Sequence, residues 1–362
     1  MAAVNNFTFM MIAPMLDFGG SNLTLEDNAS STPKSLFYTI PGPIICVFGM
    51  VCNVLNLCVL SQNILKDSPY TYLTALALSD LSFLTVSFFH LACTKTNGSY
   101  AKAFFDIYIF FSVGNIFFNI SVWLVVILTI ERMLFVIRPL KFRPSKSKAK
   151  IWIIVVFVLC SLINVPRFFC YRVRTIRNGF YPKSTPFKMS REFYNVSWFH
   201  AMVISFLPFF IILVTNSVLI FGLHRAKRER MSLHSNQEHA NRKDQVRLTR
   251  TLVAVVVVFF VCTIPSAFVD DPIAFTIFGN GRKWREYIRA PDNQLLVYIS
   301  NLLLFVNSSM NFILYCSFNK KFRLAMKIFL ENVHVYKSRT PLGGKSVNTC
   351  ACVLKKTMMT KV

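Results

Sequence analysis

Long stretches without charge recur along the chain and are separated by short segments rich in Lys and Arg. A helix needs about 20 apolar residues to cross the hydrocarbon core of a bilayer, which is about 30 Å thick. Two of the stretches contain one acid each, Asp80 and Asp106. The pattern predicts seven membrane-spanning helices, over residues 35–65, 68–94, 103–130, 151–166, 193–224, 251–269 and 293–319.

A different pattern follows the seventh predicted span. In residues 318–330, apolar side chains recur at helical spacing and bases occupy the opposite face. Such a segment lies flat on a membrane surface with its apolar face in the lipid. The expected fold class is therefore an all-α membrane protein, a seven-transmembrane helix bundle followed by a short amphipathic helix. Its predicted apolar face consists of Phe318, Phe322, Ala325, Met326 and Phe329.

Charge and glycosylation signals predict the orientation. Short loops rich in Lys and Arg mark the cytoplasmic side, and residues 138–150 carry several bases and no acid. The chain is expected in the plasma membrane with an extracellular N-terminus, although the basic segment 167–191 disagrees because this topology places it outside. Asn-x-Ser/Thr sequons, which are glycosylated only on the outer side, occur at Asn6, Asn22, Asn28, Asn97 and Asn195.

The same topology divides the chain into an extracellular glycosylated N-terminus (1–36), a seven-transmembrane domain (37–317), the amphipathic membrane-surface helix (318–330) and a basic cytoplasmic tail (331–362). Composition agrees with a membrane protein, because 54% of the residues are hydrophobic and 15% are charged. The net charge of +24 resides in loops and the tail, where it favours anionic lipid. Because no nucleic-acid-binding motif accompanies it, nucleic acid is not an expected partner. No basic residues precede the apolar segment near the N-terminus, so a cleaved signal peptide is not expected.

Short motifs in six of the spans resemble one receptor family over residues 35–330. The sequence ERM at 131–133, followed by RPLKF, is similar to the Glu/Asp-Arg-Tyr motif of rhodopsin-like G-protein-coupled receptors. Within that family, the stretches SPYTYLTALALSDL, NVPRFF and NSSMNFILYCSFNKKFR most resemble invertebrate FMRFamide-like neuropeptide receptors. Further matches are Asn53 in GMVCNVL, Asp80 in LALSD, Pro208 in FLPFF, Cys262 and Pro265 in CTIP, and Asn311 to Tyr315 in NFILY.

The resemblance implies how the chain would signal. Arg132 would be held by Glu131 in an inactive state and freed when the helices part, so that it meets a heterotrimeric G protein near Tyr315. The acid often found at the inner end of span six is replaced by Gln245, next to Asp244, which predicts a weaker hold on Arg132.

The resemblance also implies a switch within the bundle, although a pure packing role for its residues stays open. The Trp that the family often keeps before the proline of span six is Thr263 in this chain. The residues of the predicted switch are Pro208, Val122, Phe259, Cys262 and Pro265.

Polar residues inside the spans are costly to bury and are therefore usually paired or functional. Asp80, Ser121, Asn307 and Asn311 resemble the interior sodium site of the family. A lone buried carboxylate needs either a cation or a proton, so the alternative is a protonated or hydrogen-bonded Asp80. No other cofactor is expected.

The ten cysteines do not predict a disulfide framework, because most lie in spans or on the reducing side. Only Cys93 and Cys170 approach the outer surface, so their shared compartment allows a bond between them, whereas the distance between them cannot be read from the sequence. The family's usual bridge reaches the outer end of span three, where this chain has Ile107.

The ligand suggested by the resemblance is an extracellular peptide, with an amidated end and an arginine as its expected features. Retinal is disfavoured because 293–319 has no Lys, and amines are disfavoured because Gly114 replaces the aspartate of amine receptors. Asp270 and Asp271 are candidates to pair with the arginine of an Arg-Phe-amide terminus, and a water-facing helix stop is the alternative.

Other functions stay open at this point. A non-peptide ligand and a seven-span transporter are alternatives to the peptide receptor, although no internal repeat supports the transporter. An enzyme is not expected, because His90 and His200 are isolated on the outer halves of spans and resemble ordinary packing or interfacial residues. The last three residues, Thr360 to Val362, fit a C-terminal ligand for a PDZ-domain protein.

Overall fold

The computed structural model describes residues 38–93, 98–137, 144–176, 179–230, 256–266 and 291–339. Within these residues, six helical stretches are long and apolar enough to cross a membrane, and the shorter apolar helix Val256–Ser266 lies inside the predicted span 251–269. The predicted all-α bundle is therefore confirmed. The six stretches are Pro41–Leu60, Ser68–Ala92, Tyr100–Ile137, Lys146–Phe169, Arg191–Gly222 and Leu295–Phe318.

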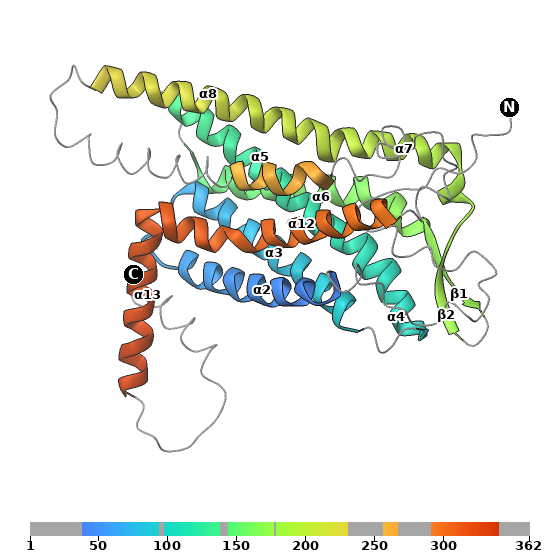
Figure 1. Cartoon of the computed structure of the whole chain (residues 1–362). Helices are drawn as coiled ribbons and strands as arrows, with labels where there is room; N and C mark the ends of the chain where they lie inside the picture. The colour runs from blue at the N-terminus through green and yellow to red at the C-terminus, as the bar shows by residue number, and fades with distance from the viewer. Residues whose placement is uncertain are drawn as a thin grey trace.

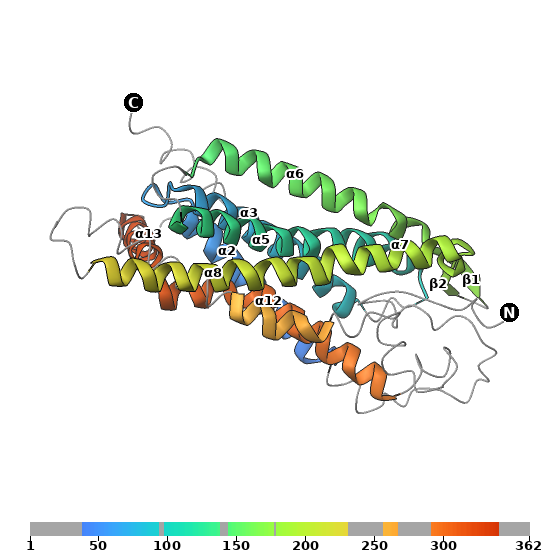
Figure 2. The same ribbon diagram turned by 90° about the horizontal axis from the view of Figure 1, so that it is seen from above.

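The long helices run alongside one another and form a single bundle (Figure 1). Helix α2 (Pro41–Leu60) packs on both α3 (Ser68–Ala92) and α12 (Pro291–Phe318). Helix α5 (Asn115–Ile137) contacts α3 and α8 (Leu207–Arg230), so it lies in the middle of the bundle. Helix α6 (Lys146–Asn164) and α12 lie on opposite flanks when the bundle is turned (Figure 2).

Two of the membrane-spanning stretches contain π-helical segments. The first runs from α4 (Tyr100–Phe104) through the π-helix η3 (Phe105–Gly114) into α5, and the second from α7 (Arg191–Ala201) through the π-helix η6 (Met202–Phe206) into α8. Pro208 lies in the first turn of α8, just after η6, and a proline has no N–H for the helical ladder, which accounts for an irregular turn at this point. π-helical turns are rare and often occur at functional sites.

One end of the bundle, called the hairpin end below, is covered by an antiparallel hairpin. Strand β1 (Tyr171–Ile176) pairs with β2 (Gly179–Ser184), and the 3₁₀ turns η4 (Val165–Phe169) and η5 (Phe187–Met189) connect the hairpin to α6 and α7. The Phe180 N–H donates to the Gly98 carbonyl at 2.9 Å, which joins the hairpin to the segment before α4. Gly98 has a φ of 86°, a conformation that favours glycine.

Helix α13 (Lys320–Arg339) crosses the other end of the bundle, called the α13 end (Figures 1 and 2). Asn319 begins it, because its side-chain oxygen accepts from the Phe322 N–H at 3.1 Å. Phe322 and Ala325 are buried, whereas Phe318 is 48% exposed and Lys320, Arg323 and Lys327 are exposed. The helix is therefore amphipathic, although Phe318 lies off its buried face.

The outer surface of the bundle is apolar. Large side chains of α6 such as Trp152, Ile154 and Phe157 are more than half exposed. Contiguous exposed apolar surface of this kind is unfavourable in water and favourable in lipid. The chain is therefore a multi-pass membrane protein.

Candidate functional site

The carboxylate of Asp80 lies at the centre of a fully buried polar cluster. The Ser121 hydroxyl donates to Oδ1 at 2.8 Å, and the Asn311 amide donates to Oδ2 at 2.7 Å. These contacts bring α3, α5 and α12 together at one point. The structure shows no hydrogen bond between Asn307 and Asp80, so three of the four residues predicted for the sodium site meet.

A second polar residue braces the same region. The Asn53 side chain donates to the Gly49 carbonyl at 2.9 Å and to the Ser308 carbonyl at 2.8 Å. It therefore links α2 to α12 one turn from Asn311. Gly49 permits this approach, because a Cβ atom there would lie 2.1 Å from the Ser309 hydroxyl.

At the α13 end, Glu131 and Arg132 are both buried and in contact. A nitrogen of Arg132 lies 3.2 Å from Glu131 Oε1, and the Ser68 hydroxyl donates to Glu131 Oε2 at 3.0 Å. The guanidinium also lies over the ring of Phe135, 5.7 Å from its centroid. Glu131 is thus fixed by α3 while it holds Arg132, which is the geometry that the resemblance implies for an inactive state.

Tyr315 is buried where α12 meets α13. Its ring packs 5.5 Å from that of Phe322, which in turn lies 6.1 Å from Phe312. Phe312 stands where the family motif carries a proline, and here its ring fills the junction between α12 and α13. The position of Tyr315 is therefore set by the packing of α13.

Two of the five predicted switch residues line a cavity inside the bundle. Val122 and Phe259 line a cavity of about 110 Å³ together with Thr263, which replaces the family's tryptophan. Pro208 and Cys262 are buried nearby in their helices but do not line it, and Pro265 is half-buried. The side chain of Thr263 is too small to fill this cavity. Its hydroxyl donates to the Phe259 carbonyl at 2.5 Å, within its own helix, and so does not reach across the cavity.

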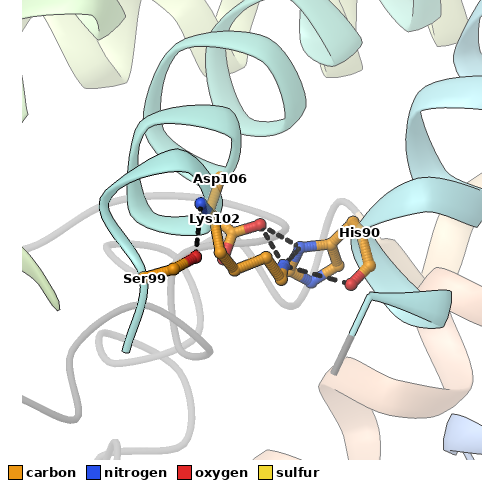
Figure 3. Close-up of polar contacts among 4 residues, drawn as sticks. All are labelled: His90, Ser99, Lys102 and Asp106. Carbon is orange, nitrogen blue, oxygen red and sulfur yellow. Dashed lines mark hydrogen bonds and ion pairs between the residues drawn. The ribbon is translucent and has the colours of Figure 1, made fainter. Parts of the chain in front are cut away.

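At the hairpin end, His90, Lys102 and Asp106 form a buried cluster that sequence reasoning missed (Figure 3). The Lys102 ammonium donates to Asp106 Oδ1 and, at 3.2 Å, to the His90 carbonyl. His90 Nδ1 lies 2.8 Å from the same carboxylate oxygen. The Ser99 hydroxyl accepts from the Lys102 N–H at 3.2 Å and begins α4.

This cluster is connected to the interior of the bundle. The imidazole of His90 stacks on Phe110, with 3.6 Å between the ring centroids. Phe110 lines a small cavity with Tyr38, Asn115 and Phe118. A movement of the His90 ring would therefore be transmitted to this cavity through its contact with Phe110. The Lys102 and Asp106 spacing of four residues on a helix was the signal available in the sequence.

A further buried cluster joins η4, α5 and α7. Arg167 and Asn119 each lie 3.3 Å from His200 Nε2, and the Arg167 guanidinium lies 5.4 Å from the centroid of Phe111. A guanidinium can only donate, so Nε2 accepts and the proton of His200 is on Nδ1. His90 and His200 are therefore not isolated, as the sequence suggested, because charged partners from other elements meet both.

The bond between Cys93 and Cys170 that their shared compartment allows is not formed in the structure. The Cys170 sulfur is directed into the core, where the S–H donates to the Pro166 carbonyl at 3.4 Å. Burial raises the pKa of the Cys170 thiol to about 11. Loop topology indicates a compartment but not a distance, so the sequence alone left this pairing open.

Several predicted residues lie outside the described residues. They are Asp270 and Asp271, Asp244 and Gln245, the sequons at Asn6, Asn22, Asn28 and Asn97, and the C-terminal residues 360–362. Asn195 is described and is exposed on α7 at the hairpin end.

Comparison with known proteins gives a consistent result. Residues 47–315 match the model of the family described as 7 transmembrane receptor (rhodopsin family). The FMRFamide receptor of Drosophila melanogaster is 27% identical over 313 residues, which cover 80% of this chain and 53% of that receptor. The chain thus spans about half the length of that relative.

Two relatives from Caenorhabditis elegans are similar over comparable lengths. The probable G-protein coupled receptor B0563.6 is 25% identical over 328 residues, 86% of this chain and 72% of the relative. The FMRFamide peptide receptor frpr-18 is 27% identical over 311 residues, 80% of this chain and 68% of the relative.

Proposed function

Because this chain belongs to the rhodopsin family of seven-transmembrane receptors, we propose that it binds an extracellular amidated peptide and activates a heterotrimeric G protein. Members of the family are receptors and not enzymes. The FMRFamide receptors among its relatives support a peptide ligand. The orientation proposed is the one predicted from loop charge, with the hairpin end outside and the α13 end in the cytoplasm.

The observation that carries the proposal is the pair formed by Glu131 and Arg132 at the α13 end. Both side chains are buried, and Ser68 holds Glu131 in place at 3.0 Å. Both residues belong to α5, and the neighbouring helices keep their ion pair out of water, so parting of the helices would expose the pair and weaken it. Parting of the helices would free the Arg132 guanidinium, which can then contact a G protein.

Agonist-dependent signalling tests the proposal. Cells expressing the full chain would be exposed to synthetic amidated peptides ending in Arg-Phe-amide, and G-protein activation would be measured. We expect a response that is lost in Arg132→Ala at equal surface expression. An unchanged response in the Arg132→Ala variant would contradict the proposed role of Arg132. The lack of any response of the wild-type receptor to these peptides would contradict the proposed ligand class.

The orientation needs its own test. An epitope tag on the N-terminus should be detected on intact cells, and a tag on the C-terminus only after permeabilisation. Detection of both tags on the same side would overturn the topology. The proposed contact of residues 360–362 with a PDZ-domain protein also requires that the tail lies in the cytoplasm.

We also propose that Asp80 binds sodium in the inactive receptor. The residues fit a cation in part, because Ser121 and the Asp80 carboxylate supply hard oxygen ligands to one buried point. Asn311 presents its amide nitrogen to Asp80 and would have to turn its oxygen toward the ion. Sodium-dependent thermal stabilisation of the purified receptor, absent in Asp80→Asn, would support the site; equal stabilisation of both proteins would exclude it.

A further inference from the structure

The outward face of the β1–β2 hairpin carries a group of bases that the signalling function does not explain. Residues 167–190 contain several Arg and Lys and no Asp or Glu. In the proposed orientation this segment is extracellular, where the rule that places basic loops inside gives no reason for them. The charge therefore needs another cause.

The pairing of the two strands brings like charges together. Arg172 lies directly opposite Lys183, and Arg174 lies opposite Tyr181. Residues that are opposite each other, or two apart on one strand, project from the same face of a hairpin. These four residues therefore share one side, called the cationic hairpin face below. Like charges directly opposite each other destabilise an antiparallel pair unless an anion lies between them.

Burial shows which way this face points. Tyr171 and Ser184, on the other face, are buried against the bundle. Arg172, Arg174 and Tyr181 are exposed and Lys183 is half-buried, and the structure shows no ion pair for the three bases among the described residues. The cationic hairpin face is thus open to solvent at the hairpin end.

The surroundings of the hairpin hold it firmly and add to its positive charge. The Thr185 N–H donates to the Cys170 carbonyl at 3.0 Å, and the ring of Phe180 meets that of Tyr100 edge to face at 5.6 Å. Behind the hairpin, the buried ammonium of Lys188 lies 3.8 Å from the centroid of the Tyr171 ring. A rigid surface loses little freedom on binding, and clustered bases attract anions over several ångströms.

We propose that the cationic hairpin face binds an acidic segment of the peptide ligand, outside the part of the peptide that enters the bundle. Carboxylates of Asp or Glu would lie between Arg172 and Lys183 and would accept paired hydrogen bonds from the arginine guanidinium groups. The like-charge pair that destabilises the empty hairpin would then favour the bound state. This inference rests on the proposed function, because it assigns the chemical class of that ligand.

A binding measurement decides the inference without knowledge of the natural ligand. The purified full-length receptor in nanodiscs of neutral lipid would be titrated with a fluorescent Glu-rich decapeptide and with its Gln-matched counterpart. We expect the acidic decapeptide to bind at least about tenfold more tightly, with affinity falling as salt rises. Removal of a rim charge mainly changes association rate and salt dependence, so Arg172→Gln should weaken binding by about threefold to tenfold.

The control variant is Arg191→Gln, which removes one exposed base at the same end but outside the hairpin. It should leave binding of the acidic decapeptide within about twofold, since a single distant surface charge is largely screened. Equal binding of the two decapeptides, or equal losses in Arg172→Gln and Arg191→Gln, would overturn the inference.

A signalling measurement then separates this inference from the proposed function. Two amidated peptides with the same Arg-Phe-amide end would be compared, one extended by Glu residues and one by Gln residues. We expect the acidic extension to lower the half-maximal concentration on the wild-type receptor and to have no effect on Arg172→Gln. Activation by both peptides with equal potency would contradict the inference and leave the receptor function intact.

Two further outcomes of the signalling measurement would point to a different ligand for the receptor or for the hairpin. If neither amidated peptide activates the receptor, the proposed ligand class fails, and the decapeptide titration still decides the binding of acidic segments. If the wild-type receptor on cells prefers the acidic extension only after sulfated glycans are removed, glycan occupies the hairpin on the cell surface, and the inference is wrong.

Discussion

The ion pair of Lys102 and Asp106 offers a test at the scale of single residues. Asp106→Asn leaves the Lys102 ammonium buried without a carboxylate, and breaking a buried pair from one side costs about 3–5 kcal/mol. The double variant Lys102→Met/Asp106→Asn removes both charges. We expect its loss of stability to be smaller than the sum of the single losses by about 1–3 kcal/mol, measured from thermal unfolding of the purified receptor.

The matched control is the pair of Lys327 and Glu331, which has the same spacing on α13 but is exposed to solvent. Its nitrogen and oxygen lie 3.9 Å apart, with 75% and 61% of the two side chains exposed. Exposed pairs of this kind contribute at most about 0.5 kcal/mol. Strict additivity at Lys102 and Asp106, as at the exposed pair, would show that the two buried residues act independently.

The thiol of Cys170 gives a prediction about pH. Burial raises its pKa from 9.0 to about 11, and the thiolate is the reactive form. In a Cys93→Ser receptor, a membrane-impermeant maleimide should therefore label Cys170 slowly at neutral pH, and faster as pH rises toward the raised pKa. Complete labelling in SDS at neutral pH is the control. Rapid labelling of the native receptor at neutral pH would contradict the buried position of Cys170.

The sequence predicted contacts correctly where a family motif fixes the position of each residue within its own span. Asp80, Ser121 and Asn311 were predicted to meet, because a buried acid needs partners and the family motifs fix their positions along three spans. It failed for His90 and His200, whose charged partners come from other elements. The distance between His90 and Asp106 depends on how α3 and η3 pack, and a single sequence does not contain that distance.

At the scale of elements, the junction of α12 and α13 depends on Phe322. Its ring is fully buried between Phe312 and Tyr315, so Phe322→Ala would leave a cavity and cost about 3–5 kcal/mol. Phe318→Ala is the matched control, because that ring is 48% exposed. We expect a lower thermal-unfolding temperature and weaker agonist-dependent signalling for Phe322→Ala only. Similar losses in both variants would mean that α13 is held by lipid contact and not by Phe322.

The helices themselves were predictable because lipid imposes a simple rule, in which uncharged stretches of sufficient length become spans. The π-helical segments η3 and η6 were not predictable, because their sequences are as apolar as the α-helices around them. The hairpin was also missed. The first strand, Tyr171–Ile176, begins with the alternation of apolar and basic residues that is typical of a strand, but Gly179–Ser184 contains a proline and shows no such alternation.

At the scale of the whole molecule, the polar contacts divide into those that hold helices together and those that a signal would break. Asp80 joins three helices in the middle of the bundle, and the cluster of His90, Lys102 and Asp106 joins neighbouring elements at the hairpin end. Glu131 and Arg132 lie at the opposite end. In the proposed mechanism, parting of the helices at the α13 end breaks the hydrogen bond between Ser68 and Glu131 and exposes Arg132, while the contacts of Asp80 and of His90, Lys102 and Asp106 can remain.

The hydrogen bond between Ser68 and Glu131 is where this motion can be tested, because it fixes α3 to α5 beside Arg132. Hydrogen bonds to charged groups contribute about 1.5–3 kcal/mol, and a change of that size shifts a two-state equilibrium by about tenfold to a hundredfold. Ser68→Ala should therefore release Glu131, weaken its hold on Arg132 and raise basal signalling, measured without agonist at equal surface expression. Ser61→Ala, which removes a hydroxyl that donates to the Cys58 carbonyl at the end of α2, should leave basal signalling unchanged. Unchanged or lower basal signalling in Ser68→Ala would mean that Glu131 holds Arg132 without help from α3, and that α3 is free to move during activation.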